Sequence, residues 1–257
     1  MNGEDVTCST ADRVATITLD RPPVNALRTQ TYLELEQALD EVARERSISV
    51  LVIRSGLERI FSAGADVKEL PMPPKADEER QRLSRRVFER ILRFPVPVVC
   101  ALPGPAIGGG CALAAVCDIR LATTNASFGL PEINVGRAGG GRFLMRLLPQ
   151  GVVRHAYFTG RPIDADTAFR LGLVASLHED AAALDEAVQS LAREIAGKSP
   201  TAIRLAKQSL DLAEELPVAK GYEAEQQFSL RLAGTPDARE AAAAFREKRE
   251  PVWEEDE

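Results

Sequence analysis

The fold of this chain is decided by two runs of small residues, Phe61-Ser-Ala-Gly-Ala-Asp66 and Pro103-Gly-Pro-Ala-Ile-Gly-Gly-Gly-Cys111. They follow the apolar runs Val50–Ile53 and Val98–Leu102, which are typical of buried strands, and each leads into a predicted helix. Small residues allow a ligand to approach the backbone, and the first N–H groups of a helix lack partners within that helix. Two such turns that face each other would form an oxyanion hole, although each alone is equally typical of a glycine-rich connection.

Outward from these runs, strands and helices alternate. Strands are predicted at Val14–Leu19, Val50–Ile53, Val98–Leu102, Ile119–Ala122 and Val174–Leu177. Two helix starts are predicted from capping boxes, one formed by Thr31 and Glu34 and the other by Asp66 and Glu69. Further helices are predicted at Arg80–Arg93, at Gly110–Val116 and from Asp164 to Gly172. Later helices are predicted at Ala181–Ala196, Pro200–Ala213 behind a Ser199 cap, Val218–Ala233 and Asp237–Arg249. The pattern predicts an α/β body followed by a helical appendage.

We place the boundary between body and appendage after residue 197. Residues 1–197 would form the core with the active site, and residues 198–257 a helical region for oligomerisation. The predicted helix at Pro200–Ala213 has an apolar face, formed by Ile203, Ala206, Leu210 and Ala213, that little remaining sequence could cover. Uncovered apolar stripes of this kind are usually interfaces, so we expect an oligomer.

Composition narrows the classes of protein. The chain has 257 residues, 45% of them hydrophobic, and a net charge of −6, which disfavours nucleic-acid binding. The N-terminus lacks the basic start and apolar run of a signal peptide, and the longest apolar stretch, Cys111–Cys117, is too short to span a membrane. None of the four cysteines forms a C-x-x-C pair, which favours reduced thiols over a metal site. We expect a cytoplasmic protein.

Several catalytic motifs are missing from the sequence. It contains no G-x-S-x-G, H-E-x-x-H or P-loop pattern, and its glycine runs do not fit G-x-G-x-x-G. The two histidines, His155 and His178, have no acid and nucleophile pattern around them, so we interpret both as structural. The remaining signal is the pair of glycine-containing turns.

The surroundings of that pair carry a family resemblance. Four motifs occur in this order: Arg21-Pro-Pro-Val-Asn-Ala-Leu27, the run ending at Asp66, the Gly-Gly-Gly-Cys111 run followed by Cys117-Asp118, and Phe128-Gly-Leu-Pro-Glu-Ile133. The chain closes with Phe245-Arg-Glu-Lys-Arg249. From about residue 12 to its end, the sequence resembles the crotonase superfamily, the enoyl-CoA hydratase/isomerase family.

The resemblance implies a spiral of ββα turns, with C-terminal helices that mediate homotrimers, often paired into hexamers. It implies an acyl-CoA substrate and no separate cofactor or metal. The oxyanion hole would map to the N–H groups of Ala65 and Gly109, beside Gly64 and Gly108, and the backbone at Ala63 would contact the adenine of CoA. Lys248 lies where the family often has a lysine near the CoA phosphates, and it is equally typical of a solvated charge at a helix end. We interpret Asp66 as a helix cap that aims the Ala65 N–H.

The acids depart from the family pattern. Family hydratases carry one glutamate directly after the glycine-cysteine run and one in the Pro-Glu dipeptide, and here these positions are Ala112 and Glu132. The acid of dienoyl-CoA isomerases falls on Gly140. Glu132 has apolar neighbours, which is typical of a carboxyl group tuned for proton transfer.

One carboxylate favours double-bond isomerisation over hydration, because a single base can take a proton from C2 and return it to C4. Alternatives within the family are a malonyl-type decarboxylase, an acyl-CoA hydrolase and a carbon–carbon lyase. An alternative of another class is a non-catalytic acyl-CoA-binding trimer, which the loss of an acid at Ala112 keeps open.

Overall fold

The computed structural model describes residues 3–253 and has a mixed α/β architecture, as predicted. The main sheet contains β1 (Val6–Ala11), β2 (Val14–Leu19), β3 (Val50–Ser55), β4 (Val98–Leu102), β6 (Ile119–Thr123) and β9 (Ser176–His178), in that order. Only the β1–β2 pair among them is antiparallel. A smaller sheet joins β5 (Ala106–Ile107), β7 (Ser127–Gly129) and β8 (Ile163–Asp164).

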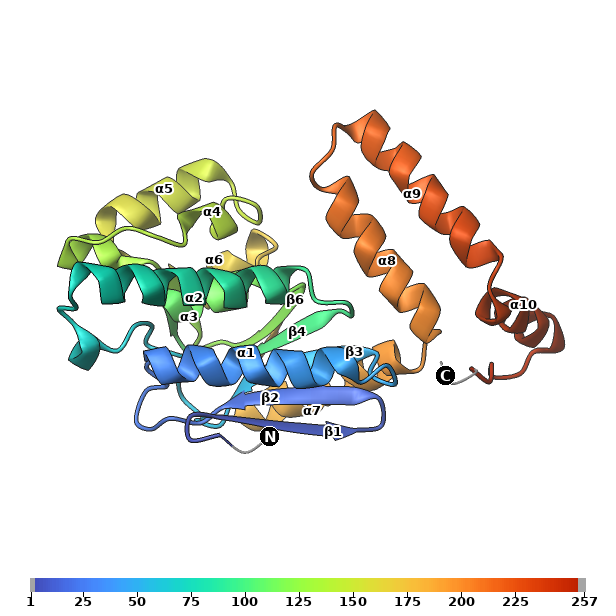
Figure 1. Cartoon of the computed structure of the whole chain (residues 1–257), viewed down its shortest axis with the longest axis horizontal. Helices are drawn as coiled ribbons and strands as arrows, with labels where there is room; N and C mark the ends of the chain where they lie inside the picture. Colours follow the sequence, from blue (N-terminus) through green and yellow to red (C-terminus); the bar gives the residue numbers. More distant parts are fainter. Residues whose placement is uncertain (1–2, 254–257) are drawn as a thin grey trace.

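Helices cover both faces of the main sheet (Figure 1). On one face, α7 (Ala181–Ala196) packs against Val50, Val52, Val99 and Ala101. The alternate residues Leu51, Ile53, Val98 and Cys100 belong to the larger core, with α1 (Thr29–Arg44), α2 (Pro74–Leu92) and α3 (Gly109–Val116). Both faces of β3 and β4 are therefore buried, which explains why these strands are continuous apolar runs.

Further elements connect the body. They are the 3₁₀ helices η1 (Val67–Glu69) and η2 (Pro131–Val135), with α4 (Gly141–Leu144), α5 (Gln150–Thr159) and α6 (Ala165–Arg170). Asp164 caps α6 as predicted, by accepting a hydrogen bond from Thr167 N. The last strand begins later than predicted: Val174 is a buried core residue before β9, and its N–H donates to Ala168 O rather than to a neighbouring strand.

The predicted capping box at Thr31 and Glu34 is wrong. Helix α1 begins at Thr29, so Thr31 lies inside its first turn, where its hydroxyl donates to Asp5. The Glu34 carboxylate accepts hydrogen bonds from the backbone of Glu4, Asp5 and Val6 at the start of β1. Both side chains thus hold a distant segment of chain, and Thr31 also accepts a hydrogen bond from Arg28 N, so it acts as the third residue of the helix and not as its N-cap.

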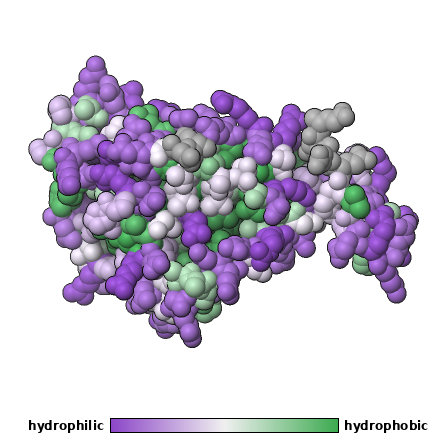
Figure 2. All heavy atoms as spheres, turned by 90° about the horizontal axis from the view of Figure 1, so that it is seen from below, coloured by the Kyte–Doolittle hydropathy of each residue, from purple (hydrophilic) through white to green (hydrophobic). Residues whose placement is uncertain are grey.

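Three helices form the C-terminal arm: α8 (Pro200–Ala213), α9 (Val218–Ala233) and α10 (Pro236–Glu247). Figure 1 shows α9 and α10 standing away from the sheet. Helix α8 is tied to the body by Lys207, whose buried ammonium group donates to Asp118 Oδ1 at 2.5 Å and to Leu92 O at 3.0 Å. Viewed from below, the surface is mainly hydrophilic with scattered hydrophobic patches, and the arm projects from the body (Figure 2).

Candidate active site

The first turn of the site, residues 61–66, is held by the segment that precedes α1. Backbone hydrogen bonds join Ala63 N to Val24 O (2.9 Å), Leu27 N to Gly64 O (2.7 Å) and Asp66 N to Leu27 O (3.1 Å). Within the described residues, the Ala65 N–H donates no hydrogen bond. Since its neighbours are fixed on both sides, this N–H is held in place and left open to a ligand.

Buried polar side chains support this turn. The Asn25 amide donates to Ser55 Oγ at 2.8 Å and to Phe61 O at 3.1 Å. Ser62 Oγ donates to Asn25 O at 2.7 Å and accepts from Gly64 N at 3.1 Å. In the sequence, Asn25 and Ser62 belong to two of the quoted motifs, and no role was predicted for either. Their burial and complete hydrogen bonding make them positioning residues of the first turn.

The second turn, residues 106–110, runs beside the first. Ser62 and Ala106 form a parallel β-bridge, and Ile107 N donates to Ser62 O at 2.9 Å. A Cβ atom added to Gly64 would lie 2.6 Å from Ile107 O and 3.2 Å from Gly109 N. This close approach, together with φ of +82° at Gly64, requires glycine there. The two predicted turns therefore do face each other.

Gly109 is the first residue of α3, and its N–H donates no hydrogen bond within the described part of the chain. The preceding Gly108 has φ of +56° and donates its own N–H to Gly129 O at 2.7 Å. The structure thus brings together the two N–H groups predicted for the oxyanion hole, those of Ala65 and Gly109. Both are unpaired in adjoining turns, and the second also lies at the positive end of a helix dipole.

Glu132 lies next to these turns, in η2. Its Oε1 lies 3.0 Å from where a Cβ atom of Gly108 would be, and its Oε2 is buried with no hydrogen-bond partner among the described residues. Burial raises the pKa of Glu132, against a smaller opposing contribution from its own backbone N–H. A carboxyl group in this environment exchanges protons more readily near neutral pH than an exposed glutamate does.

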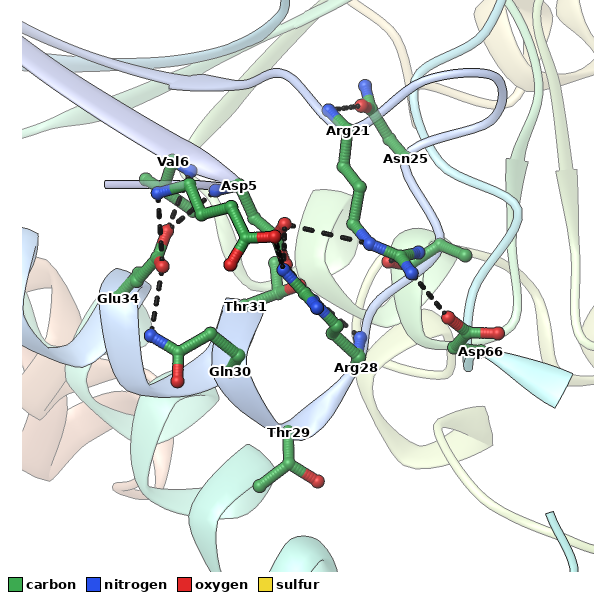
Figure 3. Close-up of polar contacts among 12 residues, drawn as sticks. Asp5, Val6, Arg21, Asn25, Arg28, Thr29, Gln30, Thr31, Glu34 and Asp66 are labelled. Carbon is green, nitrogen blue, oxygen red and sulfur yellow. Dashed lines mark hydrogen bonds and ion pairs between the residues drawn. The ribbon is translucent and has the colours of Figure 1, made fainter. Parts of the chain in front are cut away.

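Asp66 is the last residue of the first turn, and Figure 3 shows its carboxylate directed at Arg21. It caps η1 by accepting from Lys68 N at 2.9 Å, as predicted, and pairs with Arg21 at 2.7 Å. The Lys68 N–H and then Arg21 lower the pKa of Asp66, although burial opposes them. The predicted capping box with Glu69 is wrong, because the Glu69 carboxylate accepts from Thr29 N and Oγ1 instead. Asp66 is thus a fixed anion and a poor base.

The remaining predicted site residues differ in position. Ala112 is buried in α3, with its Cβ 3.5 Å from where a Cβ atom of Gly140 would lie, so neither position supplies an acid. Lys248 is the exposed C-cap of α10, and Figure 1 places that helix apart from α3. Within one chain, the structure therefore does not bring Lys248 to the turns. His155 is exposed on α5, and His178 Nε2 lies 2.8 Å from Ser176 Oγ in β9.

The chain is similar to known proteins along almost its whole length. Residues 9–256 match the family model described as enoyl-CoA hydratase/isomerase. The chain is 37% identical over 250 residues to 2,3-dehydroadipyl-CoA hydratase of Escherichia coli, covering 95% of this chain and 96% of that protein. It is 36% identical over 242 residues to a probable mitochondrial enoyl-CoA hydratase 2 of Arabidopsis thaliana, covering 92% and 80%.

Among solved structures, an enoyl-CoA hydratase from Bacillus anthracis superposes with a TM-score of 0.94 at 31% identity, covering 98% of this chain and all of that one. An enoyl-CoA hydratase from Mycobacterium smegmatis gives a TM-score of 0.92 at 29% identity, covering 98% and 99%. Within residues 3–253, no helix is both long and apolar enough to cross a membrane.

Proposed function

Because the chain belongs to the enoyl-CoA hydratase/isomerase family, we propose that it moves the double bond of an enoyl-CoA from the 3,4 to the 2,3 position, with Glu132 as the base. The observation that carries this proposal is the buried carboxyl oxygen of Glu132, which has no hydrogen-bond partner among the described residues, beside two unpaired N–H groups. Asp66 is committed to Arg21 and Lys68, and Ala112 offers no acid. CoA would enter as part of the substrate, so the reaction needs no separate cofactor.

The proposed reaction needs one base and one anion site. The Ala65 and Gly109 N–H groups bind the thioester oxygen, and Glu132 takes a proton from C2. The electron pair moves onto that oxygen, which forms an enolate stabilised by the two donors. Glu132 then returns the proton to C4 as the electrons flow back, and the double bond ends between C2 and C3. The proton lost is the proton returned, so no second acid is required.

Hydration is the second candidate, and the names of the relatives favour it. In hydration, Glu132 would remove a proton from water while the water oxygen attacks C3, and C2 would then be protonated. With one carboxylate, the same group must perform both transfers in turn. A panel of substrates separates the candidates: 3-hexenoyl-CoA reports isomerisation and crotonyl-CoA reports hydration, both followed by ultraviolet absorbance. Faster turnover of crotonyl-CoA would contradict the proposed preference, and binding without any turnover would favour the non-catalytic alternative.

We also propose that the protein works as a homotrimer or a dimer of trimers in the cytoplasm. Large apolar side chains on the arm support the assembly: Leu210 is 64% exposed, Leu230 68% and Phe245 86%. Lys248 could then approach the CoA phosphates only if another subunit supplied it, since its own chain holds it away from the turns. Light scattering that gives a monomer at micromolar concentration would contradict the assembly.

A further inference from the structure

Tyr32 has an unusual environment for a core residue. It is only 2% exposed, and its ring packs edge-on against Phe88, with centroids 6.0 Å apart. Its hydroxyl group makes no hydrogen bond within the described part of the chain, yet it is not among the fully enclosed atoms without a partner, so it keeps some access to the site. A hydroxyl group on a nearly buried side chain usually has a hydrogen-bond partner, because burying a polar group without one costs free energy. A ligand oxygen at this point would supply the missing partner.

The hydroxyl group lies at the site, not elsewhere in the core. Tyr32 Oη is 2.9 Å from where a Cβ atom of Gly109 would be, and Glu132 Oε1 is 3.0 Å from the equivalent point on Gly108. Tyr32 and Glu132 therefore flank consecutive residues of the second turn. Burial raises the pKa of Tyr32 to about 12, Arg80 opposes this, and Glu132 adds to it. The phenol is thus neutral at physiological pH and able to donate a hydrogen bond.

The helix geometry also relates Tyr32 to the small side chain of Ala112. Gly109 and Ala112 are three residues apart in α3, so they share a face of the helix. Side chains on a helix lean toward its N-terminus, so a longer side chain at residue 112 would extend over Gly109. Tyr32 Oη lies on this same side of Gly109. The phenol therefore offers a polar group in the region that alanine leaves free.

We propose that Tyr32 determines specificity by hydrogen bonding to an oxygen on C3 of the acyl chain, the 3-hydroxyl group of a 3-hydroxyacyl thioester. This inference rests on the proposed binding of an acyl-CoA thioester at the Ala65 and Gly109 N–H groups. An oxygen on C3 is three bonds from the carbonyl carbon held there, so a polar group beside Gly109, where Tyr32 Oη lies, is within its reach. The site would thus recognise 3-hydroxyacyl-CoA thioesters as well as enoyl-CoA thioesters.

The test compares two ligands that differ by one hydroxyl group, 3-hydroxybutyryl-CoA and butyryl-CoA, by isothermal titration calorimetry. Tyr32→Phe should weaken 3-hydroxybutyryl-CoA by about 3- to 10-fold, the usual effect of one neutral hydrogen bond, and leave butyryl-CoA within about 2-fold. Tyr222→Phe is the matched control, because it removes the same atom from an exposed ring on α9 and should change neither ligand.

Other outcomes would overturn the inference. Equal weakening of both ligands would place the Tyr32 hydroxyl on the thioester oxygen, and no change would mean that it contacts neither. A lower melting temperature for Tyr32→Phe would indicate a structural role, because removing an unpaired buried hydroxyl should leave stability unchanged or raise it. Wild-type protein that binds neither thioester would instead contradict the proposed function itself, so the two failures can be told apart.

Discussion

The two turns of the site and the C-terminal arm differ in which groups they leave without a partner. The structure of the turns is completed by contacts within one chain. Their backbone is fixed by hydrogen bonds to residues 24–27, 62 and 129, and the N–H groups of Ala65 and Gly109 are left unpaired within the described part of the chain. The arm shows the opposite pattern, because its backbone is satisfied in regular helices while large apolar side chains remain exposed. The difference indicates that the turns await a small ligand and that the arm awaits another protein surface.

The largest effect should come from Glu132→Gln, which keeps the size of the side chain and removes the proton carrier. We expect kcat to fall by about 100- to 10,000-fold, with thioester binding largely kept. Glu58→Gln is the control, because that side chain is exposed and outside the site. Near-normal kcat in Glu132→Gln would show that another group acts as the base.

The pH profile of the wild type sharpens this prediction. Glu132 must be ionised to take a proton, so the rate should fall as pH decreases through its pKa. Burial raises that pKa, and the midpoint should therefore lie above that of an exposed glutamate. A rate that stays constant down to the pH range of exposed carboxyl groups would contradict the assignment.

Gly109→Pro should have the next largest effect. Proline fits the first position of a helix but lacks the N–H, so one donor to the enolate is lost. We expect kcat to fall by about 100- to 1000-fold. Gly109→Ala is the matched control, because it adds the same Cβ beside Tyr32 and keeps the N–H. If both variants lose activity equally and remain folded by circular dichroism, crowding and not the lost donor is the cause.

Leu230→Asp should weaken the association of subunits through the arm and leave the two turns of the site unchanged. If this exposed side chain is buried between subunits, losing it costs about 1.5–3 kcal/mol, which weakens association by roughly 10- to 100-fold. Sedimentation velocity at several concentrations measures this. Ser229→Asp adds the same charge at the neighbouring exposed position and should have a smaller effect. An unchanged sedimentation profile for Leu230→Asp would remove α9 from the interface.

Ala112→Glu should have the smallest effect of these substitutions, and it should change the ratio of hydration to isomerisation. The new carboxylate would reach toward Gly109 and raise hydration of crotonyl-CoA relative to isomerisation, by at least about tenfold if the missing acid limits hydration. It would also raise the pKa of Glu132 by like-charge repulsion, so the gain should depend on pH. Ala112→Gln is the control of similar size. Equal ratios in the two variants would show that volume and not acidity changed the outcome.

The sequence predicted the elements whose signals are local. The buried strands, the helix at Ala181–Ala196, and the Asp164 and Ser199 caps all follow from periodicity or from neighbours within four residues. The helix predicted at Arg80–Arg93 also exists, but it begins earlier than predicted, at Pro74. Strand β1 was missed because it is mostly exposed or partly exposed and is held by Glu34, 28 to 30 residues away. The smaller sheet was missed because its strands have only two or three residues.

The site was predictable where glycine marks the backbone and unpredictable where distant side chains meet. Gly64 and Gly108 indicated the two turns, and the family order of motifs indicated Glu132. Helical spacing places Tyr32 on the apolar face of α1, but it cannot tell that the hydroxyl group ends beside Gly109. The role of Asn25 was equally hidden, since its partners lie 30 and 36 residues away.

Gly64 and Gly108, the two site glycines with positive φ, also limit which missense variants of this gene can function. Every single-nucleotide missense change of a glycine codon adds a Cβ atom. At Gly64 that atom would meet a main-chain oxygen at 2.6 Å, and at Gly108 it would meet the Glu132 carboxylate at 3.0 Å, in backbone conformations that other residues rarely adopt. We therefore expect every single-nucleotide missense change at either codon to be damaging. A saturation library selected for function should retain almost only synonymous changes at both positions.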